Sequence, residues 1–235
     1  MSDPRGAELA ANLEAIRDRI TAACTAAGRD PADVTLVAVS KTWPAADVLR
    51  LAALGIVDFG ESFDQEARPK SAAVGAAGIG VRWHFVGRLQ RNKCRSVAGY
   101  ASAVHSVDRA ELVAALGAAA HRAEASVDAY VQLSYDGDFG RGGASREDVP
   151  ALADAVAAQP GLRLAGVMVV APPDVPARAV FAAAAALRDE VSAVHPGARA
   201  LSAGMTGDLE EAIAEGATHV RVGTALFGGR GAATG

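Results

Sequence analysis

Eight short apolar runs separated by helical patterns constrain the fold of this chain more than any other feature. The apolar runs fall at 34–40, 56–60, 81–87, 103–107, 128–134, 163–170, 199–203 and 219–227. The helical patterns between them fall at 44–54, 63–76, 90–99, 109–124, 146–158, 174–194 and 207–215. Strands that alternate with helices form a parallel sheet. Because eight such units close a barrel, we predict an α/β fold, a (β/α)8 TIM-type barrel, with an open doubly wound sheet as the alternative.

An extra N-terminal helix precedes the first apolar run. Its apolar residues recur at steps of three and four, which makes one stripe: Leu9, Leu13, Ile16, Ile20 and Cys24. Gly28 and then Pro31 end the pattern. The stripe is more simply explained by packing on the barrel than by pairing with a second copy. Since the expected site is complete within one chain, we predict a monomer.

Two sequence pairs predict helix starts. Asp108 with Glu111, and Ser145 with Asp148, have the three-residue spacing of a capping pair. Glycines are expected to end the helices that precede them, at Gly55, Gly161 and Gly216.

Composition limits the class of protein. The 235 residues fit one barrel domain over 1–235, and no Pro- or Ser-rich linker divides them. Residues 231–235 are expected to form a disordered tail. The net charge of −4 gives no case for nucleic acid or an anionic membrane as partner. No apolar stretch reaches the roughly 20 residues that span a bilayer, the start lacks the pattern of a signal peptide, and two cysteines make no disulfide framework or metal site. We therefore expect a soluble cytoplasmic protein.

Lys41 stands at the end of the first apolar run. A lysine where a buried strand meets its loop is costly unless another group pairs with it. Strand alternation places Lys41 on the same face as Val37 and Val39. The alternative is a lysine that extends from a strand end into solvent.

The last apolar run carries a second polar group, Arg221 with Gly223 and Thr224. Glycine backbone N–H groups and a hydroxyl at this point suit a phosphate, because barrels often bind phosphate after strands seven and eight. Ser202 and Thr206 are candidates to add hydroxyls. Gly223 serves equally well to let the strand turn, and Thr206 to cap the helix after it.

The Lys41 amine and the phosphate-binding groups around Gly223 both lie at carboxyl ends of strands. Together they predict a phosphorylated aldehyde bound as a Schiff base. That is the chemistry of pyridoxal 5'-phosphate (PLP). Arg221 supplies a cation that favours the neutral, nucleophilic form of a desolvated Lys41. His84 either touches this ligand at the mouth of the barrel or is a satisfied core histidine. A cluster of basic residues follows the third run: Arg88, Arg91, Lys93 and Arg95. We interpret it as the solvated start of a helix, with contact to an anionic ligand or partner as the alternative.

An ordered set of motifs resembles the pyridoxal phosphate homeostasis proteins, also called proline synthase co-transcribed homologues. The motifs run from about residue 30 to 230. They are Val39-Ser40-Lys41-Thr42, Phe59-Gly60-Glu61, Gln65-Glu66, Trp83-His84-Phe85-Val86-Gly87, Leu89-Gln90, Asn92-Lys93, His105-Ser106-Val107-Asp108, Leu201-Ser202-Ala203-Gly204-Met205-Thr206 and Val220-Arg221-Val222-Gly223-Thr224-Ala225-Leu226-Phe227-Gly228.

The resemblance implies a barrel like the N-terminal domain of alanine racemase, with PLP on Lys41. It also implies phosphate contacts from Ser202, Gly223 and Thr224, and Arg221 near the pyridine nitrogen. The family has no established catalytic activity and keeps the free PLP pool in order, and PLP-dependent apo-enzymes are candidate partners. Ser62 stands where the family commonly has Asn, which weakens any contact to the cofactor ring from that position.

Three readings of function follow. A carrier is favoured because an arginine at the ring nitrogen weakens the electron sink that most PLP enzymes need. A small PLP racemase is the alternative, because racemases tolerate an arginine there, but it needs an acid/base on the second face of the substrate. In alanine racemases this group is a tyrosine whose position depends on a C-terminal domain, which we do not expect here. Of the three tyrosines, Tyr100, Tyr130 and Tyr135, only Tyr135 could replace it. The third reading, a barrel that binds another phosphate without PLP, predicts a colourless protein.

Overall fold

The eight apolar runs form eight parallel strands that pair in sequence order, and β8 pairs with β1 to close the barrel. The computed structural model describes residues 3–229. Its strands are β1 (Thr35–Val39), β2 (Asp58–Glu61), β3 (Arg82–Phe85), β4 (Ala101–Val107), β5 (Val127–Leu133), β6 (Leu162–Val169), β7 (Ala200–Ser202) and β8 (His219–Val222). The pairing of β1 with β8 confirms the predicted barrel and excludes the open sheet.

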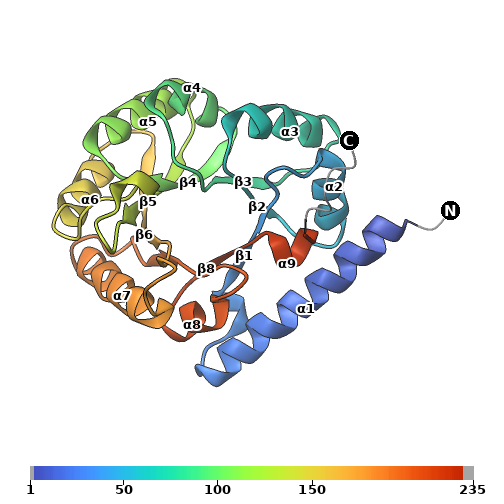
Figure 1. Cartoon of the computed structure of the whole chain (residues 1–235). Helices are drawn as coiled ribbons and strands as arrows, with labels where there is room; N and C mark the ends of the chain where they lie inside the picture. The colour runs from blue at the N-terminus through green and yellow to red at the C-terminus, as the bar shows by residue number, and fades with distance from the viewer. Residues whose placement is uncertain (1–2, 230–235) are drawn as a thin grey trace.

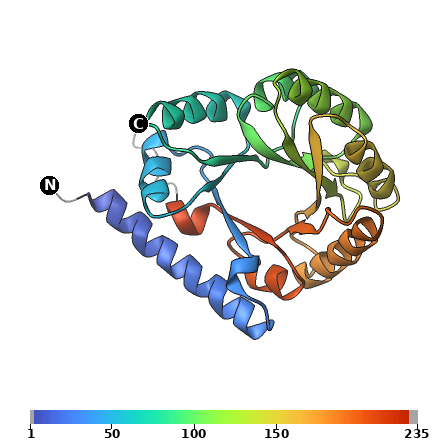
Figure 2. The ribbon, with the colours of Figure 1, turned by 180° about the vertical axis from the view of Figure 1, so that it is seen from behind.

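Helices form a ring outside the strands (Figures 1 and 2). They are α1 (Pro4–Ala26), α2 (Ala45–Ala53), α3 (Asp64–Ala76), α4 (Cys94–Val97), α5 (Ala110–Arg122), α6 (Val149–Ala157), α7 (Ala177–Val194), α8 (Leu209–Ala214) and α9 (Thr224–Phe227), with short 3₁₀ turns at Pro31–Asp33, Arg91–Lys93 and Phe139–Arg141. No helix within residues 3–229 is both long and apolar enough to cross a bilayer. The predicted tail at 231–235 lies outside the described residues.

The end of the last apolar run is where the strand prediction is wrong. The strand stops at Val222, and Thr224–Phe227 forms the short helix α9. Leu226 and Phe227 are fully buried in the same core as α1. Their apolar character therefore reflects helix packing rather than a strand, and the sequence pattern alone does not separate the two.

The two predicted capping pairs have different outcomes. Ser145 Oγ donates to Asp148 Oδ2 (2.7 Å) and accepts from the Asp148 amide (3.2 Å), just before α6. The prediction for Asp108 is wrong, because the residue that precedes α5 is Arg109 and the Asp108 carboxylate instead pairs with the Arg109 side chain. The predicted helix-ending glycines Gly55, Gly161 and Gly216 all have positive φ.

Apolar packing lies mostly between the strands and the helices, in two large clusters. A much smaller apolar cluster of Ala103, Tyr130 and Met168 belongs to three neighbouring strands, β4, β5 and β6. Polar side chains are also buried on the strands, among them His84, His105 and Arg221. A buried polar group must be hydrogen-bonded to be tolerated, so these side chains need hydrogen-bond partners inside the barrel.

Helix α1 packs along the barrel between α2, α8 and α9 (Figure 1). All five residues of its predicted stripe are buried. Polar side chains of α1 also reach the loops at one end of the barrel: Asn12 Nδ2 donates to the Leu226 carbonyl (3.0 Å), and Arg19 donates to the Thr206 carbonyl (2.8 Å). The added helix therefore braces α9 and the loop that carries Thr206.

Candidate functional site

The carboxyl ends of β1 and β8 lie side by side. Ala38 pairs with Val222, which brings the next residues, Val39 and Gly223, into contact. A Cβ atom on Gly223 would lie only 3.2 Å from the Val39 carbonyl oxygen. Glycine thus permits a close approach of the two backbones at this point. Lys41 and the Gly223–Thr224 turn consequently leave the barrel from adjacent strands.

A buried ion pair between Lys70 and Glu61 fixes the start of the loop at Ser40. Ser40 Oγ donates to Glu61 Oε1 (2.6 Å), and Lys70 Nζ donates to both Glu61 Oε1 (2.5 Å) and the Ser40 carbonyl (2.7 Å). The side chains of Lys70 and Glu61 are 7% and 1% exposed. Burial raises the pKa of Glu61 above its ordinary value even though Lys70 and Ser40 oppose the shift. The residue before Lys41 is therefore fixed through both its side chain and its carbonyl group.

The residues after Lys41 are also fixed. Thr42 has φ of +69°, which is strained for a β-branched residue, and its amide donates to Glu66 Oε2 (2.8 Å). The ring of Trp43 stacks on Phe227 of α9 with centroids 5.8 Å apart, and Arg5 lies over the same indole. The Lys41 loop is thus tied to α9, the helix that starts at Thr224.

Lys41 itself differs in one respect from the sequence expectation. Its side chain is exposed rather than desolvated, so that part of the prediction is wrong. The chain has only three lysines, Lys41, Lys70 and Lys93. The buried one is Lys70, which stabilises the loop. The exposed amine at the end of β1 remains accessible to an aldehyde that enters the mouth.

Arg221 is buried, with 5% of its surface exposed. Its guanidinium donates to Ser202 Oγ (2.6 Å) and to the Val169 carbonyl (3.0 Å), both neutral oxygens. Burial lowers the pKa of Arg221 to about 10, with partial compensation from Asp208. Arg221 is therefore still a cation at neutral pH, and it suits an anion or a lone pair at the mouth.

A set of donors surrounds the start of α9. Within residues 3–229, the amides of Gly223 and Thr224 have no backbone acceptor. Thr206 Oγ1 lies 3.5 Å from the Ala225 amide, which places its hydroxyl beside the same turn. Asp208 already accepts from the Met205 amide (2.6 Å). These donors fit a phosphate at the α9 turn, and the carboxylate of Asp208 disfavours one at the start of α8.

Three other predicted site residues are placed less directly. Ser202 is fully buried, and its hydroxyl contacts Arg221 and His105 Nδ1 (2.8 Å). His84 has both ring nitrogens engaged by protein groups, so it is a satisfied core histidine. Ser62 lies at the end of β2 beside Gly87, where a Cβ atom would come within 2.2 Å of the Ser62 carbonyl oxygen. Direct contacts from these three to a ligand stay predictions.

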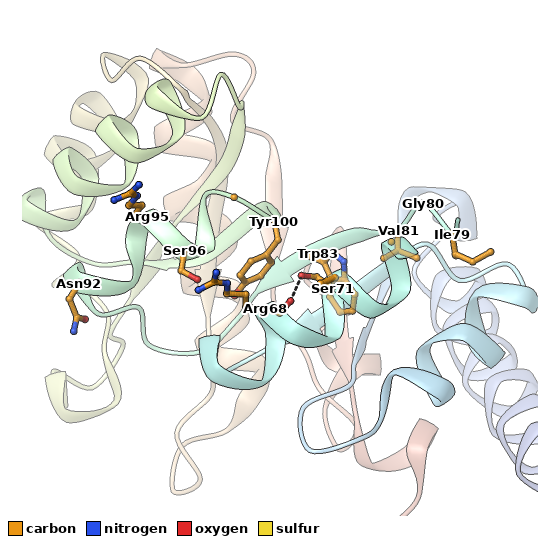
Figure 3. Close-up of a pocket in the computed structure, with 13 residues that line it drawn as sticks. Arg68, Ser71, Ile79, Gly80, Val81, Trp83, Asn92, Arg95, Ser96 and Tyr100 are labelled. Carbon is orange, nitrogen blue, oxygen red and sulfur yellow. Dashed lines mark hydrogen bonds between the residues drawn. The ribbon is translucent and has the colours of Figure 1, made fainter. Parts of the chain in front are cut away.

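Three residues of the predicted basic cluster line two hollows, and the fourth, Arg91, lines neither. Arg88 and Lys93 line a hollow of about 440 Å³ next to Ser62. Arg95 and Arg68 line another of about 890 Å³ between α3 and α4, with Trp83 at its wall (Figure 3). Trp83 and His84 are consecutive in β3, so their side chains point to opposite faces of the barrel wall. The larger hollow is therefore outside the barrel and separate from the mouth.

The sequence analysis assigned no role to several polar residues whose side chains are hydrogen-bonded in the structure: Asp58, Glu66, Lys70, His105 and His219. Glu61, Glu66 and His105 lay within the family motifs but had no assigned role. A signal was available for Asp58, because a carboxylate within an apolar run needs a partner. Its partners are His84 (2.8 Å) and Arg82 (two bonds of 2.6 Å), and despite burial these bonds lower the pKa of Asp58 to about 2.

The partly buried ring of His219 leads us to expect a loss of stability in mild acid. Its ring contacts Tyr130 and Thr218, and burial lowers its pKa to about 4. Between the ordinary histidine pKa of about 6.5 and that value, the unfolded state binds more protons, so stability falls as pH falls. We expect urea unfolding to show lower stability at pH 5 than at pH 7.5, and His219→Gln to reduce that difference. The matched control is exposed His121→Gln; equal pH dependence in both variants would contradict the assignment.

Comparisons with known proteins agree with this geometry. The family model described as "Alanine racemase, N-terminal domain" matches residues 11–231. The chain is 44% identical over 222 residues to the pyridoxal phosphate homeostasis protein of Pseudomonas aeruginosa, covering 94% of this chain and 96% of the relative. It superposes with TM-score 0.78 on PipY of Synechococcus elongatus, solved with PLP bound, at 34% identity, covering 91% of this chain and 100% of PipY. An unknown protein of Bifidobacterium adolescentis gives TM-score 0.88 at 28% identity, covering 97% of both chains.

Proposed function

Because the chain belongs to the family of pyridoxal phosphate homeostasis proteins, we propose that it binds PLP through Lys41 and acts in PLP homeostasis as a binding protein rather than an enzyme. The observation that carries the proposal is the adjacency of the exposed Lys41 loop to the Gly223–Thr224 donors, with buried Arg221 on the same strand. When bound, PLP supplies an aldehyde that forms a Schiff base with an amine.

The choice of amine rests on the three lysines of the chain. Lys70 Nζ is buried and bonded to Glu61 and Ser40. Lys93 Nζ lies 4.0 Å from Asp64 at the smaller hollow, next to Ser62. Of the three lysines, only Lys41 lies just after β1, two residues beyond its end, and its side chain is exposed. This placement supports Lys41 as the amine that captures PLP.

The donor set of the α9 turn supports phosphate as the anchoring group. Two amides and the Thr206 hydroxyl converge there, and a hydrogen bond to a charged group contributes about 1.5–3 kcal/mol. We expect Thr206→Val to weaken PLP binding by about tenfold or more. Binding of pyridoxal, which lacks the phosphate, should change little. Fluorescence titration with both ligands measures this, and an equal loss for both would contradict a phosphate contact.

Arg221 argues against most decarboxylase and transaminase chemistry, although racemases tolerate an arginine beside the ring nitrogen. A guanidinium has only N–H donors, so at the ring nitrogen, where the family resemblance places it, it opposes protonation and weakens the electron sink. Two of the three tyrosines argue against a racemase, whereas the predicted stand-in, Tyr135, is exposed. Tyr100 and Tyr130 hydroxyls bond to Asp64 and His219, and burial raises the pKa of both. A phenol with a raised pKa is a poor base at neutral pH.

A PLP titration combined with an exchange assay tests the proposal. We expect the pure protein to gain visible absorbance on addition of PLP and to catalyse no exchange of the α-hydrogen of amino acids. Exchange that depends on Lys41 would establish a racemase instead. A protein that stays colourless in excess PLP would favour the reading in which another phosphate is bound.

We also infer that the protein is a cytoplasmic monomer that can supply PLP to apo-enzymes. Both cysteines, Cys24 and Cys94, are buried and free, which fits a reducing compartment. The apolar stripe of α1 is buried against the barrel of the same chain. Light scattering at micromolar concentration should give the mass of one chain, 23.8 kDa; twice that mass would contradict the inference.

A further inference from the structure

A continuous chain of hydrogen bonds crosses the barrel interior from Arg221 to Asp58. Arg221 Nη1 donates to Ser202 Oγ (2.6 Å), and Ser202 Oγ lies 2.8 Å from His105 Nδ1. His105 Nε2 lies 2.8 Å from His84 Nδ1, and His84 Nε2 lies 2.8 Å from Asp58 Oδ1. All five side chains are buried and come from five strands, β8, β7, β4, β3 and β2.

The Asp58 end gives the chain its direction. Arg82 holds the Asp58 carboxylate with two bonds, and an ionised carboxylate only accepts hydrogen bonds. His84 Nε2 must therefore donate to Asp58. When the His84 ring carries a single proton, its Nδ1 accepts, and His105 Nε2 donates to it. Each choice follows from the one before, because a neutral imidazole has one donor and one acceptor nitrogen.

The Arg221 end completes the same direction. Burial lowers the pKa of His105 well below its ordinary value, and His84, Arg221 and His219 add to the shift, so the ring is neutral. His105 Nδ1 therefore accepts, and the Ser202 hydroxyl donates to it. The Ser202 oxygen is left to accept from Arg221, which has no acceptor of its own. Every bond thus donates from Arg221 toward Asp58.

We propose that Ser202, His105, His84 and Asp58 are positioning residues that hold the Arg221 guanidinium in one orientation for the ring of bound PLP. The inference rests on the proposed function, in which Arg221 contacts that ring. Two further contacts make the orientation rigid. The Val169 carbonyl accepts from Arg221 Nη2 (3.0 Å), and His105 stacks on Tyr130 with ring centroids 4.2 Å apart.

The first test measures the direction of the chain without any ligand. Nitrogen NMR of histidine-labelled protein at pH 8 reports which ring nitrogen carries the proton, and His84→Gln and His105→Gln spectra assign the signals. We expect both His84 and His105 to be protonated on Nε2. A proton on His105 Nδ1 would overturn the proposal, and this result does not depend on whether the protein binds PLP.

The second test asks whether the chain acts on the ligand. Ser202→Ala removes the hydroxyl that connects Arg221 to His105. Ser106→Ala is a matched control on β4, because the buried Ser106 hydroxyl has no partner within residues 3–229. We expect Ser202→Ala to raise the PLP dissociation constant about tenfold or more and to move the pH midpoint of the visible band. Ser202→Thr, which keeps the hydroxyl, should restore both.

The outcomes separate this inference from the proposed function. If wild-type protein and Ser106→Ala bind PLP and Ser202→Ala binds and titrates just as they do, the positioning role is wrong while the proposed function stands. If wild-type protein fails to take up PLP, the proposed function is wrong, and with it the role toward the ring.

Discussion

Replacing Lys41 by alanine is expected to abolish covalent capture of PLP. The amine is the only group at the end of β1 that can attack the aldehyde, since Lys70 is bonded to Glu61 and buried. The change in absorbance that marks the Schiff base in wild-type protein should be lost completely, and only the absorbance of the free aldehyde should remain. Weak, reversible binding should remain, because the phosphate donors at Gly223, Thr224 and Thr206 are unchanged. Absorbance titration and equilibrium dialysis measure the two effects separately.

Lys93→Ala is the matched control for this variant. Lys93 lines the smaller hollow next to Ser62, and within residues 3–229 its side chain makes only a long contact to Asp64. It should keep the full visible band. If Lys41→Ala keeps the band while Lys93→Ala loses it, the amine has been assigned to the wrong residue.

Replacing Lys70 by methionine is expected to cause the largest loss of stability. Methionine keeps much of the volume but leaves the Glu61 carboxylate buried with Ser40 as its remaining partner, and Glu61 Oε2 already lacks a partner among the described residues. Breaking a buried ion pair by removal of one partner costs about 3–5 kcal/mol. The free energy of unfolding in urea measures the loss.

The loss should depend on pH in a defined direction. Because the pKa of Glu61 is raised in the folded state, the folded state binds more protons than the unfolded state, and stability falls as pH rises through the raised value. Without Lys70 this effect should grow, so Lys70→Met should lose more stability at pH 8 than at pH 5. Lys93→Met, with its weak and partly exposed pair, should lose about 0–1 kcal/mol. An equal loss in the two variants would show that the ion pair with Glu61 is not important.

The sequence predicted the fold well because alternation of apolar runs and helical patterns is a local property of the chain. Four site residues could also be predicted from the sequence, because each lies at or near the end of a strand: Lys41, Arg221, Gly223 and Thr224. Features that depend on contacts between distant strands could not be predicted. Nothing in the pattern around His105 shows that Ser202, 97 residues away, is its partner.

The same limit explains the errors at particular residues. Ala225, Leu226 and Phe227 are apolar because α9 packs in the core with α1, and an apolar run of this length reads equally well as strand. Lys70 was missed because it lies on a helix in a stretch with other charged residues, where a solvated lysine is the ordinary case. Its burial follows only from the position of α3 over Glu61.

Borohydride reduction of the PLP-loaded protein followed by peptide mass mapping tests the central claim most directly. Reduction converts the Schiff base to a stable pyridoxyl group, and the chain offers only three lysines to carry it. The account predicts the added mass on the peptide that contains Lys41, in stoichiometric amount, and none on the peptides of Lys70 and Lys93. A pyridoxyl group on either of those two lysines, with Lys41 unmodified, would contradict it.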